Sequence, residues 1–303
     1  MVSVVIPLYN DEEVIAPLLL RLVPVLERME WNFQVIFVDD GSSDKSWQTV
    51  CELKKTYAFL TGIKLARNFG QQNAISAGLD NAQGEIIVLM DSDLQDRPED
   101  IPKLVDKLLK SDASMAIAKW KTRKDSRYRL LVSKLFYKIS QRLTTIKHEP
   151  NLGVFRAIRK SVVDELKNYQ EKTSTTLSIL YWIGADYVTV ELERDERQAG
   201  KSGYNLSRML GLALGRIFSF SMFPIRLATY FGLVMAFLSF VTGLFLILRR
   251  LNGVVAPGWT SVTVIILFMS GVNFFFLGIL GEYIGRTFLE AKQRPRYVVR
   301  KVI

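Results

Sequence analysis

Two acids one residue apart, Asp91 and Asp93, follow directly on the apolar residues 88–90. At the period of two that an extended chain has, both side chains point to the same side, where like charges repel each other. A cation between them, or full solvation, relieves the repulsion. Mg²⁺ and Mn²⁺ bind through one or two carboxylates together with substrate phosphates, so the pair predicts a metal site for a phosphorylated substrate.

Part of the same segment has a structural explanation. Asp96 lies just before Pro98, and proline is favoured in the first turn of a helix, so Asp96 is expected to cap a helix that begins there. In that interpretation Asp91 and Asp93 are solvated loop residues. The capping role explains Asp96 but gives no reason for the pair.

A second acidic turn, Asp39-Asp-Gly-Ser-Ser-Asp44, also follows an apolar run. One explanation is a tight turn in which Ser43 or Asp44 caps a helix that starts at Lys45. The other is that a carboxylate at the tip of the strand accepts hydrogen bonds from a nucleobase or ribose. Taken alone, the turn favours the first explanation. With the acid pair expected on the same sheet edge, a site for nucleotide and metal is the better interpretation.

The elements that must position these acids alternate in a βαβ rhythm. Short apolar runs are separated by longer helical patterns such as 14–26, which predicts a mostly parallel sheet with helices on both faces. Ligands of such sheets bind outside the carboxyl ends of the strands, where this sequence carries polar groups. The expected strands are residues 3–6, 33–38, 62–65, 85–90 and 114–118.

Two long uncharged stretches, 227–248 and 251–281, lie near the C-terminal end of the sequence. Each exceeds the ~20 residues that cross a bilayer, which predicts two transmembrane helices. The hydrophobic content of 49% and the mean hydropathy of +0.15 agree with a chain that lies partly in lipid. Neither stretch is a signal peptide, because both are far from the N-terminus. The N-terminal two thirds is therefore expected in the cytoplasm.

The formal net charge of +10 and the pI near 9.6 fit either a nucleic-acid binder or a protein at an anionic membrane surface. Basic residues gather beside the outer ends of the uncharged stretches, which favours the membrane surface, although Arg249 and Arg250 weaken the asymmetry. A lone Cys51 excludes an internal disulfide, and with a lone His148 it leaves no zinc cluster. A bound metal would need oxygen ligands.

Two further segments point to the membrane. Residues 119–147 are basic and aromatic at first and then form an amphipathic helical pattern. Residues 206–223 keep Arg208 and Arg216 apart from apolar side chains, as in helices that lie in the plane of the lipid headgroups.

Five ordered motifs together carry a family resemblance. They are Ser3-Val-Val-Ile-Pro-Leu-Tyr-Asn10, Val38-Asp-Asp-Gly-Ser-Ser-Asp44, Ala66-Arg-Asn-Phe-Gly70, Asp91-Ser-Asp-Leu-Gln-Asp96 and Gly281-Glu-Tyr-Ile-Gly-Arg286. As a set they resemble glycosyltransferase family 2, above all its membrane-bound polyprenyl-phosphate glycosyltransferases: bactoprenol glucosyltransferases, dolichol-phosphate mannose synthases and aminoarabinose transferases. The resemblance covers nearly the whole chain, including both uncharged stretches and the Arg294-Pro-Arg-Tyr297 tail.

The resemblance implies a role for each matching residue. Asp39 would contact the nucleobase or ribose, and Asp91 and Asp93 would hold Mg²⁺ or Mn²⁺ on the donor diphosphate. The other implied roles fall into three groups: a nucleotide pocket at Pro7, Tyr9 and Glu12; a grip on the acceptor phosphate by Arg123, Arg129 and Ser133; and a loop closing over the donor with Arg197, Lys201 and Ser202. For the second group, a solvated basic helix face is an equally good explanation.

The sequence departs from the family pattern at three positions. Asn151 and Val154 stand where the family often has aspartates, so a catalytic acid cannot be assumed there. Gly203 stands where a lysine is common, and Lys201 could substitute for it as a phosphate contact.

The expected architecture has four parts. A cytoplasmic GT-A domain, α/β with a mostly parallel Rossmann-like sheet, covers 1–204. An amphipathic interfacial helix follows over 205–226, then a two-helix transmembrane anchor over 227–281 and a basic cytoplasmic tail over 282–303. The protein is thus expected as a multi-pass protein of the inner (plasma) membrane.

The expected function is inverting, metal-dependent transfer of a sugar, with UDP-glucose as the first guess for the donor, onto undecaprenyl phosphate. Mannose-synthase-like and aminoarabinose transfer remain alternatives, as does a non-catalytic, membrane-tethered nucleotide-binding protein. A processive polysaccharide synthase is disfavoured, because the sequence has neither a Gln-x-x-Arg-Trp motif nor further spans. The expected partners are the nucleotide-sugar, the lipid phosphate and the bilayer, with no nucleic acid; some relatives are tetramers, so a homo-oligomer is also considered.

Overall fold

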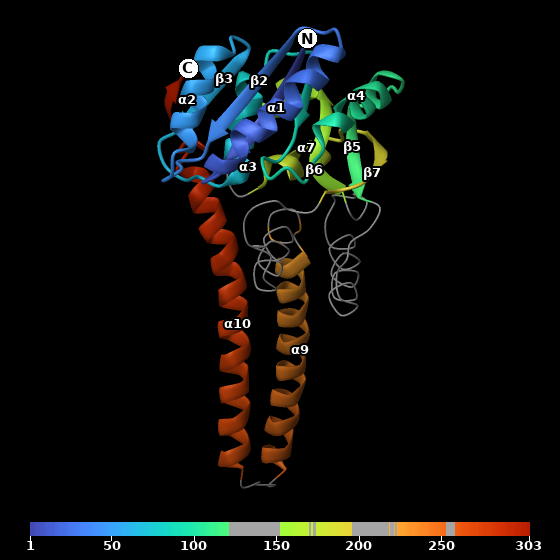
Figure 1. Ribbon diagram of the computed structural model, residues 1–303. Helices are drawn as coiled ribbons and strands as arrows, with labels where there is room; N and C mark the ends of the chain where they lie inside the picture. Colours follow the sequence, from blue (N-terminus) through green and yellow to red (C-terminus); the bar gives the residue numbers. More distant parts are fainter. Residues whose placement is uncertain are drawn as a thin grey trace.

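A mixed α/β domain sits above two long helices in the computed structural model (Figure 1). The structure describes residues 1–120, 152–169, 171, 174–195, 218, 221, 223–252 and 258–303. Within these ranges the strands form one eight-stranded sheet in the order β7-β5-β6-β4-β1-β2-β3-β8. The strands are β1 (Val2–Leu8), β2 (Phe33–Asp39), β3 (Leu60–Leu65), β4 (Ile86–Leu89), β5 (Met115–Trp120), β6 (Leu152–Arg159), β7 (Tyr187–Leu192) and β8 (Val299–Val302).

The centre of the sheet is parallel. β1 pairs in parallel with both β2 and β4, and β2 with β3. These are the apolar runs of the sequence, and continuous apolar strands are typical of a sheet that is covered on both faces. β1 is buried at every position, including Pro7, which lies opposite Val38. The expected α/β class and mostly parallel core are confirmed.

Three strands were not among those expected. β6 runs antiparallel to both β4 and β5, β7 pairs in parallel with β5, and β8 runs antiparallel to β3. β1, β2, β3, β4, β5 and β7 therefore all point the same way. Their carboxyl ends share one edge of the sheet.

Helices cover both faces. On one face α1 (Glu12–Arg28), α2 (Ser46–Thr56) and α4 (Ile101–Leu109), which follows the short 3₁₀ turn Pro98–Asp100, contribute to one hydrophobic cluster. On the other face α3 (Gln71–Asn81), α6 (Lys160–Leu166) and α7 (Thr176–Trp182) contribute to a second. Gly78 lets α3 approach the sheet closely, because a Cβ there would lie 2.2 Å from Val5 Cγ1.

The two long helices, α9 (Phe223–Leu251) and α10 (Trp259–Ala291), run side by side away from the domain (Figure 1). Each contains a segment long and apolar enough to cross a membrane, Phe223–Phe245 and Phe268–Ala291. None of the side chains described in these two segments is buried, so no protein core covers them. The second begins later than the expected 251–281 and takes in Glu282, which pairs with Arg286.

The residues after α10 return to the domain. Ala66 N donates to Val298 O, and Gly62 exchanges two backbone hydrogen bonds with Ile303. The Arg296 guanidinium donates to Tyr169 O at 2.6 Å, and the Tyr297 hydroxyl donates to Asp80. The segment 282–303 is thus divided between α10 and the sheet, where a separate basic tail had been expected.

Candidate functional site

The shared carboxyl edge brings together loops that are far apart in the sequence. The loops after β1, β2, β3 and β4 lie there, with Trp120 at the end of β5 and Glu193–Asp195 after β7. The same edge faces the two long helices, because the end of β3 lies opposite Val298 and Val299, a few residues beyond the end of α10. This is the ligand-binding edge of an open α/β sheet.

The acidic loop after β4 alternates in exposure. Asp91 and Asp93 are partly exposed, whereas Ser92, Leu94 and Asp96 between and after them are buried. The two acids thus share a side as expected, but in a loop that turns at Leu94, where φ is +59°. Gln71 Nε2, from the start of α3, donates to Asp91 Oδ1 at 2.7 Å.

Asp96 does not cap the helix near Pro98, so that expectation is wrong. No side chain caps the 3₁₀ turn Pro98–Asp100. Asp96 Oδ2 instead accepts from Asp91 N at 3.2 Å, which ties the loop to itself. Burial raises the pKa of Asp96 to about 6, against the opposing effects of Arg194 and of the Asp91 N–H. The carboxyl supports the shape of the loop that carries the pair.

Asp11 supports the loop from the other side. Its Oδ2 accepts from Ser92 Oγ at 2.7 Å and from Tyr9 N at 3.0 Å. Burial raises the pKa of Asp11, although these two hydrogen bonds lower it. The loops after β1 and β4 are therefore joined at the edge.

The loops after β1 and β2 are joined by hydrogen bonds at the starts of α1 and α2. Glu12 Oε2 accepts from Lys45 N at 2.8 Å, and Asp44 Oδ2 accepts from Glu12 N at 3.2 Å. Asp44 Oδ1 also accepts from Ser46 N, the first residue of α2, but the N-cap residue is Lys45 and makes no capping hydrogen bond with its side chain, so the expected cap by Ser43 or Asp44 of a helix starting at Lys45 is not found. The predicted pocket residues differ in access: Tyr9 is 49% exposed, whereas Pro7 is buried within β1.

Asp39 and Asp40 have separate environments. Asp39 is fully buried; its Oδ1 accepts from Ser42 N, and its Oδ2 lies 3.8 Å from Lys64 Nζ without a hydrogen bond in the described residues. Asp40 accepts from Phe69 N at 2.7 Å and Gly70 N at 2.8 Å, which fixes the loop after β3. Asp39 thus serves the turn, and its second oxygen is the atom that could meet a ligand.

Arg194 is a site residue that the sequence reasoning missed. It follows β7 and contacts Asp91 and Asp96 while its guanidinium lies over the Trp120 ring. The alternating Tyr-Val-Thr-Val-Glu-Leu of 187–192 is a strand signal, and it would have placed Arg194 at the same edge as the acids.

Val154, one of the three positions that depart from the family pattern, lies in β6. It packs against the hydrophobic cluster to which α3 and α7 contribute. Nearby, a Cβ on Gly153 would lie 2.8 Å from Trp120 Nε1, so the indole packs directly on this backbone. Arg156 is buried and donates to the Gly153 and Val154 carbonyls. This stretch is a packed strand, and the apolar side chain of Val154 cannot act as a catalytic acid or base.

Several predicted site residues lie outside the described part of the chain. Their position relative to the carboxyl edge is therefore not part of the described structure. They are Arg123, Arg129, Ser133, Arg197, Lys201 and Ser202, together with Asn151, Gly203 and most of the interfacial segment 205–226.

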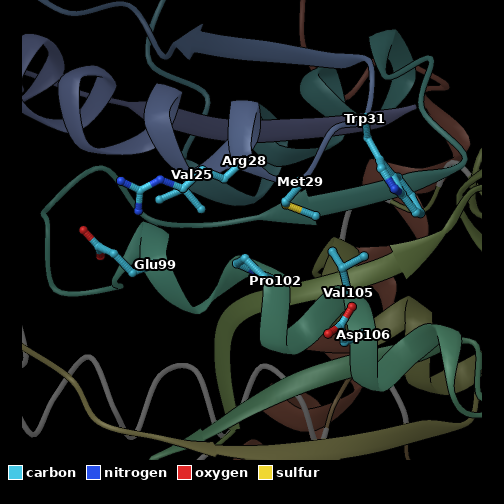
Figure 2. Close-up of a pocket in the computed structure, with 8 residues that line it drawn as sticks. All are labelled: Val25, Arg28, Met29, Trp31, Glu99, Pro102, Val105 and Asp106. Carbon is cyan, nitrogen blue, oxygen red and sulfur yellow. The ribbon is translucent and has the colours of Figure 1, made fainter.

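A cavity of about 330 Å³ lies elsewhere (Figure 2). It sits between the end of α1 and α4, next to Trp31, which precedes the start of β2 and so marks the opposite edge of the sheet. It contains none of the predicted site residues. We therefore place the candidate site at the carboxyl edge, where the acidic side chains and Arg194 lie close together.

The residues present fit a hard divalent cation. Asp91 and Asp93 are partly exposed oxygen ligands, and the described residues contain no group of three or more His, Cys, Asp or Glu that could enclose a metal. A cation here would complete its shell from substrate oxygens and water, as Mg²⁺ does in phosphate-transfer sites.

Fold and edge together define the class of protein, a GT-A-type glycosyltransferase. The family model for glycosyl transferase family 2 matches residues 3–167. The chain is 37% identical over 304 residues to the prophage bactoprenol glucosyl transferase homolog of Escherichia coli K12, covering 99% of each chain. It is 32% identical over 310 residues to the undecaprenyl-phosphate 4-deoxy-4-formamido-L-arabinose transferase of Aeromonas hydrophila, covering 100% of this chain and 94% of the relative. The chain belongs to glycosyltransferase family 2.

A solved structure agrees on the fold. Mannosyl-3-phosphoglycerate synthase from Rubrobacter xylanophilus matches with a TM-score of 0.50 at 15% identity, over 71% of each chain. At this identity the match concerns the fold alone.

Proposed function

We propose that the protein transfers a sugar from a nucleotide-sugar, with UDP-glucose the first candidate, to undecaprenyl phosphate. The product would be an undecaprenyl-phosphate sugar with inverted anomeric configuration, used in the modification of cell-envelope glycans. The observation that carries the proposal is the full-length similarity to a bactoprenol glucosyl transferase homolog, which includes the paired apolar helices as well as the sheet.

The geometry supports a lipid acceptor. The carboxyl edge of the sheet lies on the side of α9 and α10, so a donor bound at the edge would be close to the headgroup plane (Figure 1). A polyprenyl chain does not leave the bilayer without losing favourable apolar burial, so the catalytic edge must come to the lipid. In this arrangement the domain is on the cytoplasmic side of the inner membrane and the two helices anchor it.

Asp91 and Asp93 would hold Mg²⁺ or Mn²⁺, which would offset the charge of the donor's diphosphate. Gln71 and Asp96 orient Asp91, while Asp11 fixes Ser92 between the two acids. Tyr9, Glu12 and Asp39 are proposed nucleotide contacts, with Pro7 shaping the strand beneath them. Arg197, Lys201 and Ser202 are proposed for the donor loop.

The acceptor needs little activation. A lipid monophosphate is already anionic near neutral pH, so its oxygen can attack without a strong base, and the absence of acids at Asn151 and Val154 is tolerable. The requirement is to position two negatively charged groups and balance their charge. Arg123, Arg129 and Ser133 are proposed to do this for the acceptor phosphate.

The test is transfer in detergent micelles with the purified full chain, undecaprenyl phosphate and a panel of donors. UDP-glucose, GDP-mannose, UDP-N-acetylglucosamine and a UDP-linked 4-formamido-arabinose would be compared by mass spectrometry of the lipid, with and without EDTA. We expect a glycolipid from one donor and its loss with EDTA. Product from the arabinose donor alone would support the function of the Aeromonas relative instead.

No product from any donor, with nucleotide binding intact, would contradict catalysis and support a membrane-tethered nucleotide-binding role. Product that is unaffected by EDTA would retain the transfer reaction but remove the metal from the proposal.

A further inference from the structure

Arg194 places a positive charge beside Asp91, one of the two acids proposed to hold the metal, and beside the supporting carboxylate of Asp96. Its Nη2 lies 3.6 Å from Asp91 Oδ2, and its Nε lies 3.5 Å from Asp96 Oδ1. The guanidinium carbon is 5.2 Å from the centre of the Trp120 ring. The planar guanidinium is a cation that suits both the ion pair with a carboxylate and the stacking on an aromatic ring.

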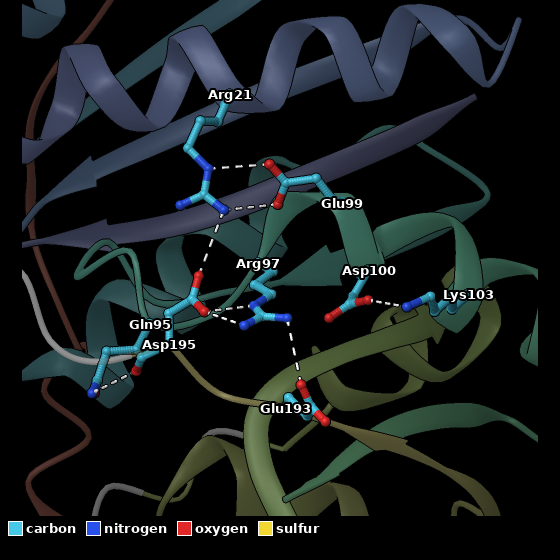
Figure 3. A network of polar contacts seen from close by, with 8 residues as sticks. All are labelled: Arg21, Gln95, Arg97, Glu99, Asp100, Lys103, Glu193 and Asp195. Carbon is cyan, nitrogen blue, oxygen red and sulfur yellow. Dashed lines mark hydrogen bonds and ion pairs between the residues drawn. The ribbon is translucent and has the colours of Figure 1, made fainter.

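The residues on both sides of Arg194 are fastened to the acidic loop (Figure 3). Asp195 N donates to Gln95 O at 3.0 Å, and Arg97 Nε donates to the Asp195 carboxylate at 2.6 Å. Glu193 lies 3.8 Å from Arg97. We call Gln95, Arg97 and Asp195 the clamp.

The clamp fixes the backbone position of Arg194 against the loop that carries Asp91 and Asp93. The base of the Arg194 side chain is therefore held close to the acidic loop, and the Trp120 ring lies under its guanidinium where it meets Asp91. Arg21 adds a second cation to the clamp, 3.8 Å from Asp195 Oδ2.

A divalent cation on Asp91 and the Arg194 guanidinium would compete for the same carboxylate. Two like charges a few ångströms apart repel strongly in a partly desolvated site, since Coulomb energy falls only as the inverse of distance and dielectric constant. The donor's diphosphate carries the opposite charge and can receive the guanidinium once it binds. A metal ion that binds alone should thus meet the guanidinium at Asp91, whereas a metal ion that binds with the nucleotide should meet a carboxylate from which the guanidinium has been drawn away.

We propose that Arg194 is a positioning residue that keeps the Asp91–Asp93 site from binding a divalent cation tightly until a nucleotide diphosphate is present. The inference rests on the proposed metal site. It assigns an order to the ligands: the cation is retained together with the nucleotide and is held weakly before it.

The experiment measures Mn²⁺ alone. Free Mn²⁺ would be followed by electron paramagnetic resonance in titrations of the full chain in detergent, comparing wild type with R194Q, R194M and R194K. Removal of the charge is expected to tighten Mn²⁺ binding at least about tenfold. R194K keeps the charge and should stay closer to wild type than R194Q does. R28Q, which removes an exposed arginine at the end of α1, is the matched control and should not change binding.

Thermal unfolding of each variant separates a structural role from the proposed one. R194M keeps an apolar stem over Trp120, so it serves if R194Q is poorly folded. A folded R194Q or R194M that binds Mn²⁺ no more tightly than wild type overturns the inference. The same titration with UDP or GDP present tests the underlying site: if wild type and variants bind no Mn²⁺ with or without either nucleotide, the metal site itself is overturned, and the inference with it.

Discussion

At the scale of single residues, the acid pair gives the sharpest prediction. Asp91→Asn and Asp93→Asn each keep the shape of the side chain but remove a negative ligand. We expect the rate of sugar transfer to fall at least ~10²-fold, the scale on which preorganised electrostatic groups act in other enzymes. Asp106→Asn, an exposed acid on α4, is the control and should leave the rate unchanged. Full activity in either pair variant would remove these residues from the mechanism.

Asp40 is predicted to matter for stability. Both of its oxygens accept backbone hydrogen bonds, from Phe69 and Gly70, and the side chain is 2% exposed. Asn offers a single acceptor oxygen and would turn an amide N–H toward a backbone donor. Asp40→Asn should therefore cost about 1–3 kcal/mol of stability, measured as a lower Tm in detergent. Asp112→Asn, at an exposed position, should leave the Tm within a degree or so of wild type.

At the scale of elements, the seam between α3 and the sheet can be tested by a double mutant. Gly78→Ala should destabilise the domain by about 1–3 kcal/mol, because the added Cβ has no room beside Val5. Val5→Ala removes the facing methyl groups, so the double variant should recover part of the loss. Losses that simply add in the double variant would show that the contact is not the cause.

The elements also show what the sequence could predict. The runs that became β1 to β5, and the uncharged stretches within α9 and α10, are local signals, and they were enough to place the acids at one edge. β6 was hidden because it carries the buried Arg156 and a glycine, and β8 because Val-Arg-Lys-Val reads as a charged surface segment. Their pairing depends on contacts between distant parts of the chain. The Asp96 cap failed for a local reason, because its carboxylate accepts from Asp91 N within the same loop.

At the scale of the whole molecule, we predict that β8 stabilises the catalytic domain. Ending the chain after Tyr297 removes the backbone hydrogen bonds to β3 and the Ile303 side chain that packs on the core. The truncated protein should unfold at a lower temperature in detergent, with new proteolytic cleavage near the exposed edge strand. Arg300→Ala keeps the strand and alters only an exposed side chain, so it should behave like wild type. Equal stability of the truncated form would show that β8 is dispensable.

The return of the chain to β3 also has a consequence for biosynthesis. β3 is made early, but its antiparallel neighbour β8 follows α10 in the sequence. While the ribosome is still producing α9 and α10, the domain has an open edge at β3. The backbone groups of Gly62 and Ala66 cannot yet form their hydrogen bonds with Ile303 and Val298. The sheet is completed only after both helices have been made. Completion of the sheet is thus coupled, by the order of the chain alone, to the synthesis of both long helices.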